Sequence, residues 1–176
     1  MMEIYRSPYE AYPFLSDKPE DLRCDFEIAT DKVTSKVGLL RALCPEEDMK
    51  EELQKIGELV YHSNPTLRTK LTLVKEEVDW LNSCVQRLKE ETVGRCDKFV
   101  LPQGSERACI AHILRAECKE LVRLLYRYCY CGNSVEPILI DFTSLLSGYF
   151  FLMALKLNQM DGVDEIPYVS RNYLQK

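Results

Sequence analysis

Apolar residues recur every three or four positions in five separate stretches of the chain, which is the spacing of one helix face. The predicted helices cover about residues 26–43, 45–64, 72–92, 105–130 and 134–158. The third shows the pattern most clearly, with apolar residues at positions 74, 78, 81, 85 and 88. We find no competing stretch with the two-residue period of a strand and no internal repeat. The pattern therefore predicts an all-α bundle of five helices.

Turn and cap residues set the expected boundaries. Pro45 follows the first helix and opens the second, whose first turn carries acidic residues as the helix dipole favours. Asn64 precedes a proline and is expected to end the second helix, and Thr72 is expected to cap the third. We expect an irregular N-terminal arm over residues 1–25, one bundle domain over 26–158 and a tail of turn and coil over 159–176.

Composition fits this class and narrows the possible partners. The chain has 176 residues, 46% of them hydrophobic and only 7 of them glycine, as expected of one helical domain with a real core. A net charge of −5 disfavours non-specific binding to nucleic acid or to a membrane surface, so neither is predicted as a partner. The N-terminus lacks the apolar segment of a signal peptide, and the apolar run 138–157 contains several polar residues typical of a buried helix. We expect a cytoplasmic protein.

Cysteine and histidine do not form a recognisable metal or catalytic motif. The eight cysteines include one isolated Cys129-Tyr-Cys131 pair, and the only histidines are His62 and His112, whereas a structural zinc site needs four ligands in paired clusters. Cys109 lies three residues before His112 on one helix, while a catalytic Cys-His pair normally joins different elements. We therefore predict reduced core thiols and no metal site in the protein.

A row of cations is the chemical feature that most needs explanation. Arg115, Lys119 and Arg123 lie four residues apart on one side of the fourth helix, and only Arg123 has an acid, Glu120, three or four residues away. Like charges at this spacing destabilise a helix, so we expect a partner outside the helix, the alternative being a solvated basic face. Arg115 also falls on the apolar stripe, where a guanidinium needs a buried carboxylate or a bound anion.

The segments around this row carry a family resemblance. Phe99-Val-Leu-Pro-Gln-Gly-Ser105 and Ala111-His-Ile-Leu-Arg-Ala-Glu-Cys-Lys119 resemble the motif of the PduO-type corrinoid adenosyltransferases, Phe-x-Leu-Pro-Gly-Gly followed by His-x-Ala-Arg-x-x-x-Arg/Lys. Residues 30–41 and 142–151 are similar to two further family segments, so that the resemblance extends over about residues 26–158. It implies a trimer of five-helix bundles that moves the adenosyl group of ATP to the cobalt of a reduced corrinoid and releases triphosphate, with magnesium.

The resemblance also implies roles for individual residues. Asp31 would pair with Arg115 across a subunit interface, and Arg115 and Lys119 would lie along the ATP phosphates as the catalytic cations, with Arg123 continuing the binding row. Phe99 would lie against the lower face of the corrinoid and keep the cobalt free of an axial ligand. The implied ligands are cobalamin and Mg-ATP, held between subunits of a homotrimer. The alternatives are an ordinary core aromatic for Phe99 and a purely structural pair for Asp31 and Arg115.

The sequence departs from the family pattern where the family holds its nucleotide. The family has an N-terminal Thr-Gly-Asp-x-Gly loop, but residues 1–30 contain no glycine and cannot form that phosphate nest. Ser144, Leu145 and Gly148 replace an Asn, an Arg and an Asp of the fifth helix, Val122 replaces an acid, and Gln103 replaces the first glycine of the turn. We therefore expect a divergent member whose adenosyl transfer is weakened or lost. The alternative is a non-catalytic trimeric scaffold or partner-binding protein with a vestigial site.

Overall fold

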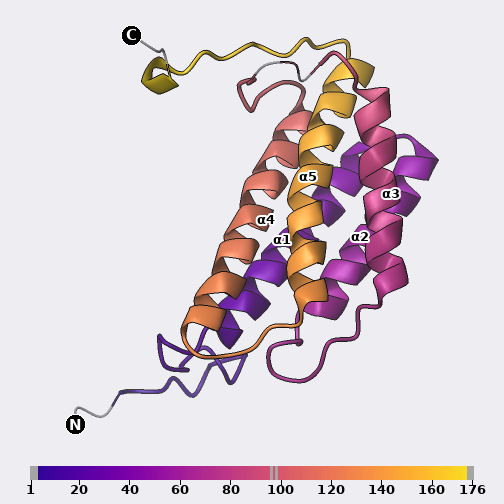
Figure 1. Ribbon diagram of the computed structural model, residues 1–176. Helices are drawn as coiled ribbons and strands as arrows, with labels where there is room; N and C mark the ends of the chain where they lie inside the picture. The colour runs from indigo at the N-terminus through magenta and orange to yellow at the C-terminus, as the bar shows by residue number, and fades with distance from the viewer. Residues whose placement is uncertain (1–3, 96, 98, 174–176) are drawn as a thin grey trace.

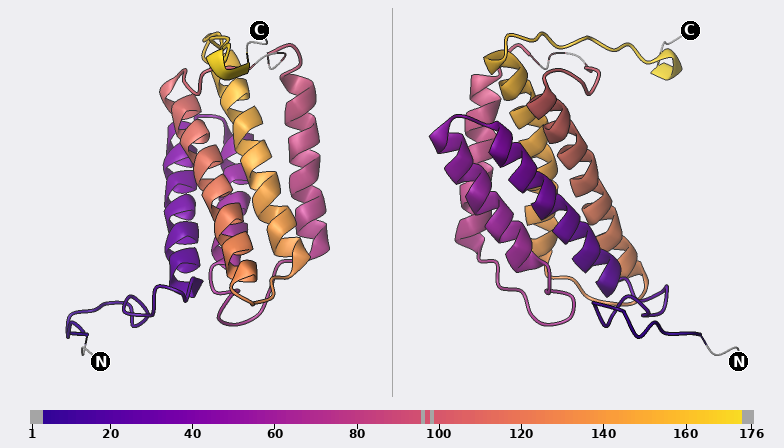
Figure 2. Two further views of the ribbon diagram at one scale, coloured as in Figure 1. Left: turned by 60° about the vertical axis from the view of Figure 1, so that its left-hand side comes forward. Right: turned by 180° about the vertical axis from the view of Figure 1, so that it is seen from behind.

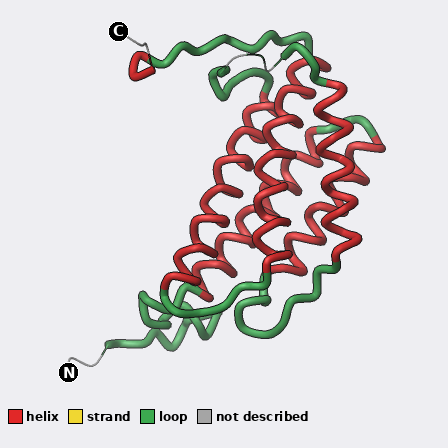
Figure 3. The backbone as a smooth tube through the Cα atoms, in the orientation of Figure 1, coloured by secondary structure: helices red, strands yellow, loops and turns green. Residues whose placement is uncertain are grey.

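The computed structural model describes residues 4–95, 97 and 99–173, and in these residues the protein forms five α-helices. The helices are α1 (Arg23–Leu43), α2 (Glu47–Ser63), α3 (Lys75–Glu91), α4 (Glu106–Tyr130) and α5 (Pro137–Met160), followed by one turn of 3-10 helix, η1 (Arg171–Tyr173). The described chain contains no named strand, and its one isolated β-bridge joins Val100 to Pro167 (Figure 3). The predicted all-α five-helix bundle is thus confirmed. Residues 1–3 of the expected arm and 174–176 of the expected tail lie outside the described residues.

The helices are arranged so that one connection must cross the end of the bundle. Helix α1 packs against α2 and α4, and α5 packs against α3 and α4. As Figures 1 and 2 show, α4 runs antiparallel to both α1 and α5, whereas α3 and α5 run in the same direction. Helices α3 and α4 are separated by α5, so the loop between them passes over the C-terminal end of α5. This crossing loop, residues 92–105, carries Phe99.

The buried faces follow the apolar stripes of the sequence. Helix α5 is the most apolar and supplies the largest share of the core, including Phe142, Tyr149 and Phe150, all fully buried. By length and composition it could cross a membrane, but half of its most apolar 18-residue window is buried inside the protein, as in the core helix of a globular bundle.

Four of the described helices begin elsewhere than predicted. Helix α2 begins at Glu47 rather than at Pro45. Helix α1 begins at Arg23 rather than near residue 26, because Leu22 and Cys24 are already buried and the Asp21 carboxylate accepts a hydrogen bond from the Arg23 backbone N–H (3.2 Å). Helix α5 begins at Pro137 rather than near residue 134. Proline is accommodated in a first helical turn because its missing N–H has no helical partner there.

Helix α3 also begins later than expected, and Thr72 does not cap it. The Thr72 hydroxyl donates a hydrogen bond to the His62 carbonyl O (3.4 Å), outside the helix. The N-cap position is taken by Val74, whose backbone N–H donates to Glu77 Oε2 (2.9 Å). A glutamate three residues inside the helix therefore supplies the capping contact that the threonine was expected to make.

The described cysteines are free thiols and most are buried. Cys24, Cys44, Cys84 and Cys118 are buried in the bundle, whereas Cys131 is exposed at the C-cap of α4. Burial raises the pKa of the Cys84 thiol to about 11 and raises the pKa of Cys118 further. These thiols agree with the prediction of reduced core cysteines, except that Cys96 lies outside the described residues.

Candidate functional site

A cavity of about 540 Å³ opens where the crossing loop meets the middle of α4 and α5. It brings together an aromatic residue from the loop, cations from α4 and small residues from α5. Its lining residues are Asp97, Phe99, Val100, Arg115, Lys119, Ser147, Gly148 and Phe151. Three of the five site residues expected from the sequence therefore line one cavity: Phe99, Arg115 and Lys119.

Phe99 is not a core aromatic. Its residue is 80% exposed although it lines the cavity, so the side chain is held at the surface with most of its ring open to solvent. Burying a phenylalanine is worth about 2 kcal/mol relative to leaving it exposed. An aromatic held open beside a cavity is therefore available to a flat apolar ligand.

Arg115, also in the cavity lining, lies half-buried without a charge partner among the described residues. Its Nε atom is buried and has no hydrogen-bond partner within the described chain. The guanidinium carbon lies 5.9 Å from the centre of the Phe151 ring, at the outer limit of a cation–π contact. Ser147 Oγ donates to the Arg115 carbonyl O (3.3 Å), which ties the backbone of α4 to α5 at this level. The charge of Arg115 thus remains available to a ligand or to another subunit.

The acids next to the cationic row are already engaged elsewhere. Glu117 is paired with Lys36 of α1 and lies 3.4 Å from Lys32, and Glu120 lies 3.6 Å from the same Lys32. From its helical spacing, Glu120 was the expected partner of Arg123, but in the structure it pairs with Lys32 instead. The paired acids therefore leave Lys119, which is exposed at the cavity, free of any ion pair in the part of the chain that is described.

The other two expected site residues lie outside this cavity. Asp31 is exposed on α1 and makes no ion pair within the described residues, and Arg123 is exposed further along α4. Neither residue is among those that line the cavity. An Asp31–Arg115 pair is thus not formed within one chain, and pairing between subunits stays a prediction.

His112 was not among the expected site residues, although it matches the His of the family motif, and the structure buries it close to Phe151 of the cavity lining. It is 4% exposed, neither ring nitrogen has a hydrogen-bond partner in the described chain, and its ring lies 6.3 Å from that of Phe151. Burial, together with the positive charge of Arg115, lowers the pKa of His112 to about 4. His112 is therefore neutral at pH 7 and adds no charge beside Arg115. Its position one helical turn before Arg115 was the sequence feature that could have predicted its place near the site.

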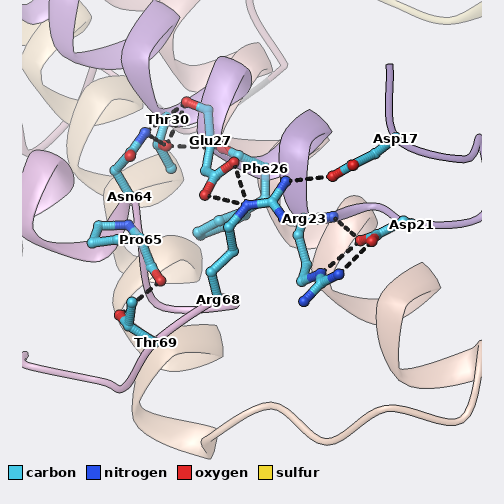
Figure 4. A network of polar contacts seen from close by, with 10 residues as sticks. All are labelled: Asp17, Asp21, Arg23, Phe26, Glu27, Thr30, Asn64, Pro65, Arg68 and Thr69. Atoms are coloured by element: carbon cyan, nitrogen blue, oxygen red, sulfur yellow. Dashed lines mark hydrogen bonds and ion pairs between the residues drawn. The ribbon is translucent and has the colours of Figure 1, made fainter. Parts of the chain in front are cut away.

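The N-terminal arm is fixed to the far end of the bundle by Arg68 (Figure 4). Arg68 Nε donates to both oxygens of the buried Glu27 (2.7 and 2.9 Å), and Nη2 donates to Asp17 (2.8 Å). The guanidinium also stacks 3.7 Å from the centre of the Phe14 ring, which meets Tyr12 edge-on. The arm therefore contacts the bundle through Phe14 and Asp17, whereas Tyr5 and Tyr9 stay exposed. In Figure 1 this end lies opposite the crossing loop.

No metal site is evident in the described chain. Among residues 4–95, 97 and 99–173, no group of three or more His, Cys, Asp or Glu side chains could hold a metal ion.

Comparison with known proteins assigns the family. A family model for cobalamin adenosyltransferase matches residues 18–157. A corrinoid adenosyltransferase of Bacillus subtilis (strain 168) is 25% identical over an alignment of 158 positions, which covers 85% of this chain and 81% of that protein.

Solved structures of a PduO-type ATP:corrinoid adenosyltransferase from Lactobacillus reuteri share the fold. A variant with a phenylalanine replaced by alanine, complexed with cobalamin and ATP, has a TM-score of 0.76 and 20% identity, covering 85% of this chain and 87% of that one. A variant with an arginine replaced by lysine, complexed with ATP, has a TM-score of 0.75 and 22% identity, covering 85% and 88%. Since the family model extends from the N-terminal arm to the last turns of α5, this chain belongs to the cobalamin adenosyltransferase family.

Proposed function

We propose that this protein binds a corrinoid and ATP at the cavity between Phe99 and Arg115, and that transfer of the adenosyl group is slow or lost. The observation that carries the proposal is that an 80% exposed aromatic and two cations without an ion pair among the described residues line one cavity of about 540 Å³, to whose lining Asp97 adds a carboxylate. Family membership supports the ligand classes, and the Lactobacillus reuteri relative was solved with both cobalamin and ATP.

The two sides of the cavity suit different parts of these ligands. A corrin ring placed over Phe99 would cover the exposed aromatic face and displace water from it. Arg115 and Lys119 would face the triphosphate, because guanidinium and ammonium groups bind phosphate through charge-assisted hydrogen bonds. During transfer a cobalt–carbon bond forms and the bond from carbon to the triphosphate oxygen breaks, so these cations would stabilise the departing triphosphate.

The lining of the same cavity supports the expectation of weak catalysis. Ser147 and Gly148, the residues of α5 beside the cations, carry no charge, and residues 1–30 contain no glycine for a phosphate-binding loop. Each charge-assisted hydrogen bond is worth about 1.5–3 kcal/mol, or roughly ten- to a hundredfold in rate if it acts in the transition state. Loss of several such bonds would leave little turnover, while the apolar side of the corrinoid site is retained.

The proposal includes a homotrimer whose sites lie between subunits. Asp31 is exposed on α1 and Arg115 has a buried Nε without a partner in its own chain, which supports pairing between neighbouring copies. Magnesium bound with ATP would be held through the phosphate oxygens, in keeping with the lack of a ligand cluster in the described chain.

Titration with cob(II)alamin, with and without Mg-ATP, tests the proposal. We expect a change in the corrinoid absorption spectrum as the lower axial ligand leaves, and expect Phe99→Ala to abolish it. Val93→Ala is the matched control, because Val93 is equally exposed in the same loop but does not line the cavity. Adenosyl transfer at the rate of active family members would refute degraded catalysis. Absence of any spectral change would leave the non-catalytic scaffold as the better account.

A further inference from the structure

The segment that follows α5 lies alongside the loop that carries Phe99. Tyr168 N–H donates to the Phe99 carbonyl O (2.7 Å), and Leu101 N–H donates to the Ile166 carbonyl O (2.9 Å). These bonds flank the antiparallel bridge between Val100 and Pro167. Residues 163–168, here called the C-terminal strap, therefore hold the backbone of Phe99 directly, and Figure 1 shows both segments at the same end of the bundle.

Side chains fasten the strap to the beginning of the same loop. Arg95 Nη2 donates to the Val163 carbonyl O (2.6 Å) and forms an ion pair with Glu165 (2.8 Å). The side chains of Arg95 and Glu165 are only 19% and 9% exposed, so the ion pair is largely shielded from water. An ion pair shielded in this way fixes geometry better than a surface pair, which salt and side-chain motion weaken.

The last turn of α5 holds the other end of the loop. Asn158 is fully buried, and its Oδ1 accepts from Ser105 N–H (2.9 Å) while its Nδ2 donates to the Gln103 carbonyl O (3.1 Å). Gly104 has a φ of +149°, and a Cβ at that position would lie 1.8 Å from Asn158 Oδ1. The loop is therefore clamped on both sides of Phe99, while the Phe99 side chain has little packing of its own.

From this arrangement we infer that Glu165 and the Tyr168 backbone N–H are positioning groups, which fix Phe99 over the cavity so that it can accept a corrinoid. The inference rests on the proposed function and adds to it a role for the C-terminal strap. An exposed aromatic on an unrestrained loop would have to be ordered when ligand binds, and that ordering lowers affinity. The strap supplies the order in advance.

The test uses full-length variants in which one backbone donor is removed. Tyr168→Pro deletes the N–H that bonds to Phe99, and the extended conformation that proline imposes on residue 167 suits the bridge. Val169→Pro is the control, because it places the same ring one residue further on, at a 69% exposed position whose N–H makes no hydrogen bond in the described chain. Glu165→Gln, which keeps the side-chain shape, removes the charge that pairs with Arg95.

Three readouts separate positioning from general stability. Tyr168→Pro and Glu165→Gln should each raise the cob(II)alamin concentration at half-saturation by about two- to tenfold, the range for loss of one hydrogen bond. ATP affinity should stay at the wild-type value, and Val169→Pro should match wild type in both titrations. In the unliganded protein, Tyr168→Pro should speed hydrogen exchange at the Leu101 amide relative to Val169→Pro.

The outcomes distinguish this inference from the proposed function. Equal exchange at Leu101 and equal corrinoid titrations in the two proline variants would overturn the positioning role. Equal losses of corrinoid and ATP affinity would also overturn it, because a purely structural strap affects both ligands. If wild type gives no corrinoid response while Tyr168→Pro still speeds exchange at Leu101, the proposed function fails and the positioning role fails with it.

Discussion

Replacing Arg68 by methionine should destabilise the bundle more than any surface charge change. The substitution leaves the Glu27 carboxylate, whose side chain is 6% exposed, buried without its bidentate partner. Breaking a buried ion pair by removing one member costs about 3–5 kcal/mol. The lost stacking on Phe14, 3.7 Å from the guanidinium, adds about 1 kcal/mol. The bond to the more exposed Asp17 adds less than the bond to Glu27. We therefore expect a loss of about 4–6 kcal/mol.

Urea unfolding followed by circular dichroism measures this loss. With a slope of about 2 kcal/mol per molar urea, the midpoint should fall by about 2–3 M. Lys75→Met is the control, because Lys75 pairs with Asp79 on the surface, with side chains 76% and 62% exposed, and should leave the midpoint unchanged.

A double variant tests whether the cost arises from the stranded carboxylate. Arg68→Met combined with Glu27→Met should be more stable than Arg68→Met alone, because an apolar pair of similar volume removes the unpaired charge. The reasoning is refuted if Arg68→Met costs less than about 1 kcal/mol, or if adding Glu27→Met makes the loss larger.

Two further predictions concern the site and the assembly. Arg115→Ala should weaken a trimer by about 3–5 kcal/mol, because it would strand a carboxylate of the neighbouring copy, whereas the exposed Arg123→Ala should have little effect. Light scattering measures the oligomeric state, and thermal melting measures the stability of each variant. A monomeric wild type, or equal melting temperatures for the Arg115 and Arg123 variants, would contradict the inter-subunit pair. His112 has a pKa of about 4 in the folded state, below its ordinary value near 6.5, so the unfolded chain takes up the proton first and stability should fall by about 2 kcal/mol between pH 7 and pH 5. His112→Gln should lose this component of the pH dependence, whereas His62→Gln, at an exposed position, should keep it. Urea unfolding at pH 7 and pH 5 measures the difference. The same pH dependence in both variants and in wild type would contradict the role of His112.

Local patterns predicted the helices well because each helix buries a face defined by nearby residues. The spacing of apolar residues located all five, and the structure adds that Ser105 caps α4, its Oγ accepting from Ala108 N–H (3.3 Å). The start of α3 was wrong because Thr72 fits an N-cap by residue type, yet its hydroxyl bonds to the His62 carbonyl O, and Glu77 instead accepts from the backbone N–H of Val74.

The candidate site was predictable only in part, because its residues come from different elements. The row of Arg115 and Lys119 was visible from spacing within one helix. The exposure of Phe99 could not be predicted from spacing. It depends on a loop that Asn158 and Glu165 hold, and both residues are more than fifty residues away in the chain. Such long-range hydrogen bonds leave no periodic trace in the sequence. The proposed pairing of Asp31 with Arg115 stays a prediction, because contacts between copies are contained neither in the sequence nor in a single chain.

The buried thiols allow transient opening of the helices to be measured by the rate at which the thiols are alkylated. Only thiolates react with alkylating reagents, so the raised pKa and the burial of Cys84 and Cys118 suppress their modification in the folded state. Cys131, exposed at the end of α4, should react at the rate of a free thiol. The alkylation rate of Cys84 divided by that of Cys131 then gives the free energy of transient opening of α3, and the same ratio for Cys118 gives that of α4. Both are measured at equilibrium and without denaturant. A ligand that binds only the folded protein should slow modification of Cys84 and Cys118 by the factor by which it stabilises the closed state.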